Sequence, residues 1–364
     1  MSAGADIRIQ MMTPPEVVLD RWGRTQSRKH RACGGYVGKL DIEKVGSPSF
    51  RSFLLFVQEA INGALLSENV NASGGVEHPP FHFDYLQVND GTKNAHAFQE
   101  EGFAFIVATL PLVELLWDLS LRLSRSPEVL RLLQIDPAVV MPDALQGLLF
   151  TVQIGFLVSH EYTHHIHLHV DRGGIIGTWT EFLPNEAGGG MDFQAQELDA
   201  DGYAVYLGLT NLVRGGARQG TLDQLGRHDL QALDADGFLL MCFFLSVTAF
   251  FSALWPENLE ITSIEQFRHP PVPVRIEYAI RIAKMWCEQN GSVPESWFAT
   301  DRFRALFNTA ADAVGATTRR AWDTHILFLL SKEGAEYDGR LSERFQAMRM
   351  KRDKSAQTTP AGRA

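Results

Sequence analysis

Residues Asp143–Val170 read DALQGLLFTVQIGFLVSHEYTHHIHLHV and contain the run H-E-Y-T-H at positions 160–164. Asp143 is suited to cap a helix over this segment. Residues 148–158 are apolar on nearly every side, which is typical of a buried helix. Burying an unpaired polar group costs about 1–3 kcal/mol, so such a helix should not carry two His and a Glu without partners. A bound metal ion would remove that conflict.

His160 and His164 are four residues apart, so they lie on one face of the helix, with Cβ atoms about 5–6 Å apart. Two imidazoles placed in this way can bind one zinc ion at about 2.0–2.1 Å. Glu161 lies about 100° round the helix from His160, beside the ion, where it can take a proton from a metal-bound water. We expect the other histidines of the segment to be structural or to support the ligands: His165, His167 and His169.

A catalytic zinc site needs three protein ligands and an open position, and the next predicted helix offers the third. Glu197 and Asp201 are four residues apart there and share a face. Glu197 can bind the ion, while Asp201 can accept the outer N–H of a ligand imidazole. The small residue Gly202 would let this helix approach the first one closely. The alternative interpretation is a solvated acidic face, because Asp199 adds a third acid.

H-E-x-x-H followed by E-x-x-x-D on a second helix is the gluzincin pattern. Residues 269–276, HPPVPVRI, look like the H-P-P-x-x-x-R-I segment of the prenyl-protein and heat-shock membrane protease family. Residues 94–98, NAHAF, resemble that family's N-A-x-A edge. The resemblance covers about residues 81–278, with the motifs in family order. The chain is also similar to the small phage-exclusion type of gluzincin, which is soluble or peripheral.

The resemblance implies a zinc metallopeptidase whose metal ligands are His160, His164 and Glu197. Glu161 would be its general base. The family has a His and an Arg near the substrate, and the matching positions are His269, expected to stabilise the oxyanion, and Arg275, expected to support the substrate or the site. The resemblance also implies that a substrate peptide binds along the edge at Asn94 and Ala95. The alternative for the HPPVPVRI segment is a Pro-rich turn with a solvated His and a surface Arg.

The sequence predicts an α+β fold, with a mostly helical, zincin-like body and a small antiparallel sheet. Strands are expected at 81–88 and 102–109, with a turn signal at 89–91 between them. We expect residues 1–35 to be loosely ordered and 36–349 to form a single metallopeptidase domain with its core at 81–290. The polar residues 350–364 are expected to be a disordered tail.

Composition restricts the partners and the compartment. The chain has 364 residues and a net charge of −10, which argues against nucleic acid as a partner. Three widely separated cysteines and no evident signal segment favour a cytoplasmic protein. Residues 237–255 carry no charge and are almost long enough to span a bilayer. Since acidic residues flank them without a basic cluster, we favour a core helix, with membrane association as the alternative.

The function that we expect is hydrolysis of peptide bonds by a zinc-dependent endopeptidase acting on a peptide or protein substrate. One alternative is a catalytically silent, zinc-stabilised binding or regulatory protein with the same fold. The presence of Glu161, which structure alone does not require, favours the enzyme. A third interpretation is a helical scaffold in which the H-E-x-x-H run is accidental.

Overall fold

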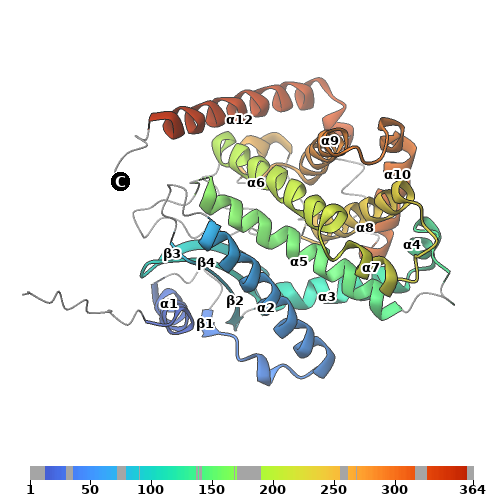
Figure 1. Ribbon diagram of the computed structural model, residues 1–364. Coiled ribbons are helices and arrows are strands. Elements are labelled where there is room, and N and C mark those ends of the chain that lie inside the picture. The colour runs from blue at the N-terminus through green and yellow to red at the C-terminus, as the bar shows by residue number, and fades with distance from the viewer. Residues whose placement is uncertain are drawn as a thin grey trace, which may run out of the picture.

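The structure is a computed structural model, and it describes residues 13–29, 36–71, 79–89, 91–136, 138, 142–167, 169, 190–254, 261–267, 269–315 and 326–358. Most of these residues are helical, and a four-stranded sheet lies toward one side of the molecule, with helices on both of its faces (Figure 1). The α+β class predicted from the sequence is therefore confirmed.

The strands are β1 (Tyr36–Lys39), β2 (Phe81–Val88), β3 (Ala95–Glu100) and β4 (Phe103–Thr109). The α-helices are α1 (Pro15–Lys29), α2 (Pro48–Asn71), α3 (Leu110–Arg125), α4 (Pro127–Leu132), α5 (Pro142–Ile166), α6 (Met191–Leu209), α7 (Arg218–Gln224), α8 (Ala232–Ala253), α9 (Val272–Asn290), α10 (Thr300–Val314) and α12 (Lys332–Thr358). Shorter helical turns are η2 (Ile42–Lys44), η5 (Ile261–Gln266) and η6 (Glu295–Phe298), and α6 continues into a π-helix, η4 (Thr210–Arg214).

The sheet is mixed rather than antiparallel, which corrects the prediction. Its strand order is β1-β2-β4-β3, and β2 runs parallel to β4 from the pair Phe81–Ala104 onward. After β2 the chain crosses to the outer edge and forms β3. It then reverses at Glu101 and Gly102, which have the positive φ angles, 45° and 84°, that suit a two-residue hairpin turn. This hairpin places β4 between β3 and β2, in the same direction as β2.

The two faces of the sheet pack against different helices, because successive strand residues point to opposite sides. On one face, Phe105 and Val107 form a small cluster with Trp22 of α1. On the other, Ile106 and Ala108 join the large core that contains α3 and α5. The helix α1 lies within the segment that we expected to be loosely ordered, so that part of the prediction is wrong.

Residues 237–253 of the apolar segment predicted at 237–255 lie in α8, in the middle of the large core, and residue 255 lies outside the described part of the chain. It packs against α3, α5 and α10. Within the described part of the chain, α8 is the one helix long and apolar enough to cross a membrane, and its apolar window is entirely buried inside the protein. Its position is thus that of the core helix that the flanking charges favoured.

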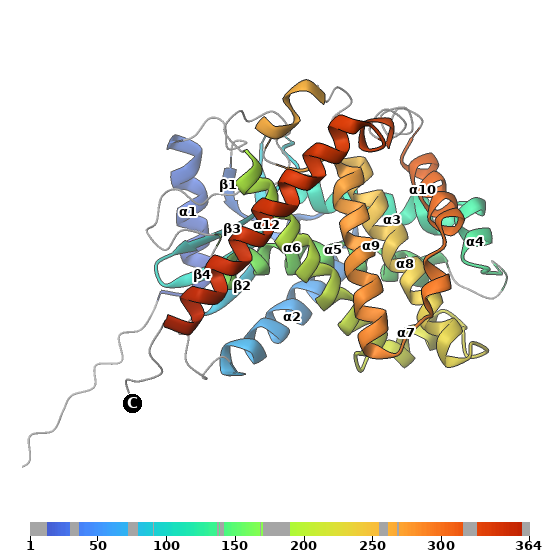
Figure 2. The same ribbon diagram turned by 90° about the horizontal axis from the view of Figure 1, so that it is seen from above.

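The long helix α12 lies across α6 (Figure 2). It continues to Thr358, so residues 350–358 are helical where we expected a disordered tail. The remaining residues of that predicted tail, 359–364, lie outside the described part of the chain. In its position over α6, α12 helps to fix the helix that carries the predicted acidic ligand.

Candidate metal site

The helix α5 presents the two imidazoles predicted to bind a metal. It begins at Pro142 and ends at Ile166, slightly before the predicted end at Val170. His160 and His164 are both buried, and their Nε2 atoms lie 3.0 Å apart. The i, i+4 spacing has therefore brought the two ring nitrogens to one point inside the protein.

The helix α6 runs beside α5 (Figure 1). It adds the carboxylate of Glu197 to this point. Oε2 of Glu197 lies 3.3 Å from Nε2 of His160, and Oε1 lies 3.6 Å from Nε2 of His164. Four ligands placed tetrahedrally at about 2.0–2.1 Å from zinc would be separated by about 3.4 Å. The closest approaches between the three residues are near this separation and the residues are buried, so the group can hold a metal ion.

Asp201 fixes the orientation of His160, as predicted for a carboxylate on this face of α6. Its Oδ1 lies 2.9 Å from Nδ1 of His160. Because a carboxylate only accepts, Nδ1 carries the proton and Nε2 keeps its lone pair for a metal. Burial alone would raise the pKa of Asp201, but the positive charge of Arg275 and hydrogen bonds from Arg275 and His160 outweigh it and hold the pKa below its ordinary value.

Arg275, in the first turn of α9, supports Asp201. Its Nε and one terminal nitrogen each donate to the Asp201 carboxylate at 2.7 Å. The guanidinium is buried and also lies over the ring of Phe251 in α8, 4.3 Å from its centroid. Of the two roles predicted for Arg275, this position corresponds to support of the site.

His269 precedes α9 and contacts the acidic ligand. Its Nδ1 is 3.1 Å from Oε2 of Glu197, and its buried Nε2 has no hydrogen-bond partner among the described residues. Burial opposes ionisation of Glu197, but neighbouring imidazoles, above all the charge of His269, hold its pKa well below the ordinary value. His269 is therefore within reach of the cluster, as the resemblance implied.

The side chain of Glu161, the predicted general base, is also completely buried, next to His160 in α5. His165 has a different function, because its Nε2 donates to the carbonyl oxygen of Phe105 in β4 at 2.9 Å. That contact ties the end of α5 to the sheet.

Gly202 does permit a close approach of α6, but to Tyr278 of α9, where a Cβ atom would lie 2.8 Å from the ring.

A second group, which the sequence did not lead us to expect, consists of His167, His169 and Asp199. Just after the end of α5, the backbone N–H of His169 donates to the carbonyl of His164 at 2.8 Å. The side chains of the two residues are also in contact, with 3.1 Å between their Nδ1 atoms. Burial lowers the pKa values of His164 and His169, so both imidazoles are favoured in the neutral form.

Asn94 and Ala95, predicted to bind substrate, stand at the start of β3, the outermost strand beside β4. Both are buried. The side-chain oxygen of Asn94 accepts from the backbone N–H of Ala95 at 2.9 Å, and its backbone N–H donates to the hydroxyl of Thr109. In this position Asn94 fixes the register of the β3–β4 pair.

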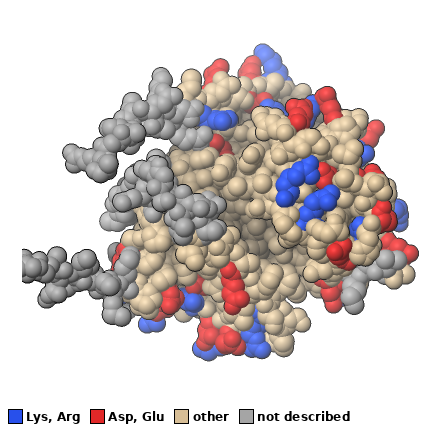
Figure 3. Space-filling model, in the orientation of Figure 1, with Lys and Arg blue, Asp and Glu red and all other residues tan. Residues whose placement is uncertain are grey.

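Figure 3 shows that the face seen in Figure 1 is hollowed at its centre and has few charged side chains there. A pocket of about 270 Å³ lies between α5, the end of α6 and α7, and is lined by Gly155, Ser159 and Gly208 among others. Ser159 directly precedes His160. The pocket is therefore lined in part by α5, the helix that carries the predicted metal ligands His160 and His164.

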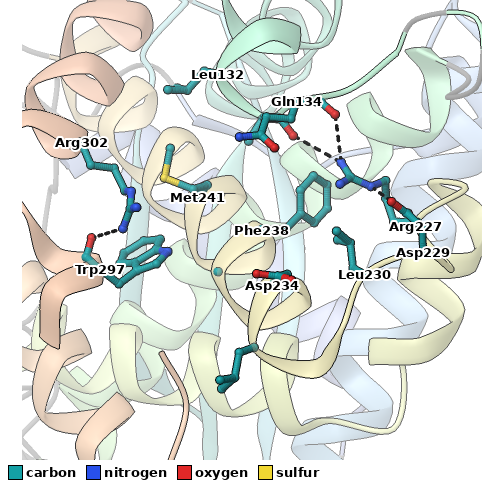
Figure 4. Close-up of a pocket in the computed structure, with 13 residues that line it drawn as sticks. Leu132, Gln134, Arg227, Asp229, Leu230, Asp234, Phe238, Met241, Trp297 and Arg302 are labelled. Carbon is teal, nitrogen blue, oxygen red and sulfur yellow. Dashed lines mark hydrogen bonds and ion pairs between the residues drawn. The ribbon is translucent and has the colours of Figure 1, made fainter. Parts of the chain in front are cut away.

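A larger pocket, of about 510 Å³, lies near the start of α8 (Figure 4). Gly237 lines it, whereas Phe251 contacts Arg275, and at 1.5 Å per residue these two positions are roughly 20 Å apart along α8. Arg227 donates to the carbonyls of Leu133 and Gln134. The second arginine at this pocket, on α10, likewise donates to a backbone carbonyl, and we assign no function to the pocket.

Comparisons with protein-family models, with curated proteins and with solved structures found no match. The chain is accordingly defined by its fold and site, as an α+β protein whose buried His160, His164 and Glu197 can hold a metal ion.

Proposed function

We propose that this protein is a zinc-dependent endopeptidase and that His160, His164 and Glu197 hold the metal. The observation that carries the proposal is that these three residues are buried and that their donor atoms approach one another to 3.0–3.6 Å, which suits tetrahedral zinc. Two imidazoles and one carboxylate form a ligand set of known zinc hydrolases. Zinc bound there would supply Lewis acidity, which polarises a carbonyl group and acidifies a water molecule.

Each nearby side chain has a distinct task in this proposal. Glu161 accepts the proton of the attacking water and passes it to the leaving amine. Asp201 keeps the proton of His160 on Nδ1, and Arg275 keeps Asp201 ionised. His269, whose Nε2 has no hydrogen-bond partner within the described residues, donates to the developing oxyanion when that nitrogen is protonated.

The test separates the base from the metal. Glu161→Gln keeps the size of the side chain and removes its ability to accept a proton. We expect the variant to keep its zinc, measured by elemental analysis, and to cleave labelled casein and a mixed peptide library at least ~10²-fold more slowly than wild type. Equal activity of the two proteins would contradict the mechanism.

The wild-type protein supplies the second comparison. Zinc bound at one ion per chain with no cleavage of casein or the library would instead favour the metal-stabilised binding protein. Absence of tightly bound zinc would exclude both functions and leave the H-E-x-x-H run as an accident of sequence.

A further inference from the structure

The group formed by His167, His169 and Asp199 offers three ligand atoms within 4.8 Å of one another, which suggests a second metal site. Its contact with the first group argues for a different role. His169 reaches His164 twice, through its backbone N–H and through the 3.1 Å contact between the two Nδ1 atoms. The second group is therefore attached to a predicted ligand of the first.

A hydrogen bond between two ring nitrogens contains one proton, and its position decides what the opposite nitrogens can do. If His164 binds a metal through Nε2, its proton is on Nδ1 and is donated to Nδ1 of His169. The proton of His169 is then on Nε2. That nitrogen lies 3.4 Å from Oδ2 of Asp199, which can accept the proton, and because Nε2 is protonated it has no lone pair for a second metal.

We propose that His169 is a positioning residue for His164, and that His164, His169 and Asp199 form a hydrogen-bonded chain rather than part of a second metal site. The proposal rests on the metal site proposed above. In this arrangement the two imidazole ligands are supported in the same way, because the Nδ1 atom of each is linked to a carboxylate of α6. His160 reaches Asp201 directly, and His164 reaches Asp199 through the ring of His169.

His167 provides the matched control. Its Nδ1 contacts the same Oδ2 of Asp199, at 2.5 Å, and its ring packs on Tyr203. In the hydrogen-bonded chain it is a neighbour of Asp199 and does not carry the link to His164. In a second metal site it would be as necessary as His169.

The experiment measures zinc stoichiometry and the zinc dissociation constant by competition with a chelating indicator, using the full chain. Losing the outer partner of a ligand histidine typically weakens metal binding about 10- to 100-fold. We expect one zinc per wild-type chain and weakening of this size in His169→Ala. His169→Asn keeps an acceptor oxygen near the position of Nδ1, so it should bind zinc close to wild type, and His167→Ala should do the same.

Several results would overturn the proposal. Two zinc ions per wild-type chain, one of which is lost in both His167→Ala and His169→Ala, would establish a second metal site. Two other results would show that a hydrogen-bond acceptor at position 169 does not support zinc binding. One is equal zinc affinity of wild type and His169→Ala, and the other is equal loss of zinc affinity in His169→Asn and His169→Ala. Should His169→Ala not fold, Asp199→Ala replaces it, with weakening expected. A wild-type chain that binds no zinc would refute the proposed function itself.

Discussion

The replacement of Arg275 by Met tests how the predicted metal site is supported. Arg275 is only 4% exposed, and its guanidinium donates twice to Asp201, which is completely buried. Met has a similar length and no charge. The variant would therefore leave the Asp201 carboxylate buried, with His160 as its remaining partner in this arrangement.

The expected loss is large because the ion pair is buried. Removing one partner of a buried pair typically costs about 3–5 kcal/mol, since the other charge remains uncompensated. The control is Arg281→Met, six residues further along the same helix. Arg281 is half-exposed and pairs with Glu277 at 2.7 Å. Exposed pairs of this kind contribute about 0.3–0.5 kcal/mol.

The assay is urea unfolding of both variants and wild type after chelator treatment, so that bound metal does not contribute. The pKa of Asp201 is lowered in the folded protein, so its pairing adds stability above its ordinary pKa of 3.8, and that stability is lost as pH falls through the lowered value. The difference in free energy of unfolding between Arg275→Met and wild type should therefore be greatest at neutral pH and become smaller in acid.

A loss of less than about 1 kcal/mol in Arg275→Met, no greater than in Arg281→Met, would refute the reasoning. A double variant that also carries Asp201→Asn should recover part of the loss, because it no longer buries an unpaired charge. If the double variant were instead less stable by the sum of the two single losses, the two side chains would act independently.

Three further predictions concern the site and the compartment. Glu197→Ala should lose tightly bound zinc in elemental analysis, and a variant with full zinc content would show that the third ligand is another residue. His269→Ala should keep its zinc and its fold but lower kcat more than it raises KM with a peptide substrate, whereas unchanged kinetics would leave the segment before α9 as a turn. After cell lysis, the protein should be recovered without detergent, since α8 is buried in the core; recovery only from detergent-extracted membranes would reverse this assignment.

The fold was predictable from the sequence where a pattern is local. Residues 81–88 alternate strongly and form β2 as predicted. The direction of β4 relative to β2 depends on where β3 lies in the sheet, and the local alternation of residues does not predict that position. The expectation that residues 1–35 are loosely ordered overlooked that Pro is favourable at the first position of a helix. The helix α1 begins at Pro15 and buries Trp22 against the sheet.

The candidate site follows the same rule. The spacing of His160 and His164, and that of Glu197 and Asp201, is set by the helix itself, and the structure brings all four side chains together. We expected His169 to be structural or to support the ligands, but its contact with His164 was not predictable, because a straight helix would separate the two side chains. The contact forms just after α5 ends, where the backbone N–H of His169 donates to the carbonyl of His164.

The assembly of the site from α5, α6 and α9 has a consequence for the order of events during synthesis. Asp201 follows His160 by 41 residues, and Arg275 follows Asp201 by 74. At a synthesis rate of about 5–20 residues per second, His160 leaves the ribosome roughly 6–23 s before Arg275, the residue that supports its partner Asp201. Late in that interval the nascent chain holds the three proposed ligands but lacks the arginine that supports Asp201. We therefore expect the proposed zinc site to be fully supported only after α9 has been synthesised.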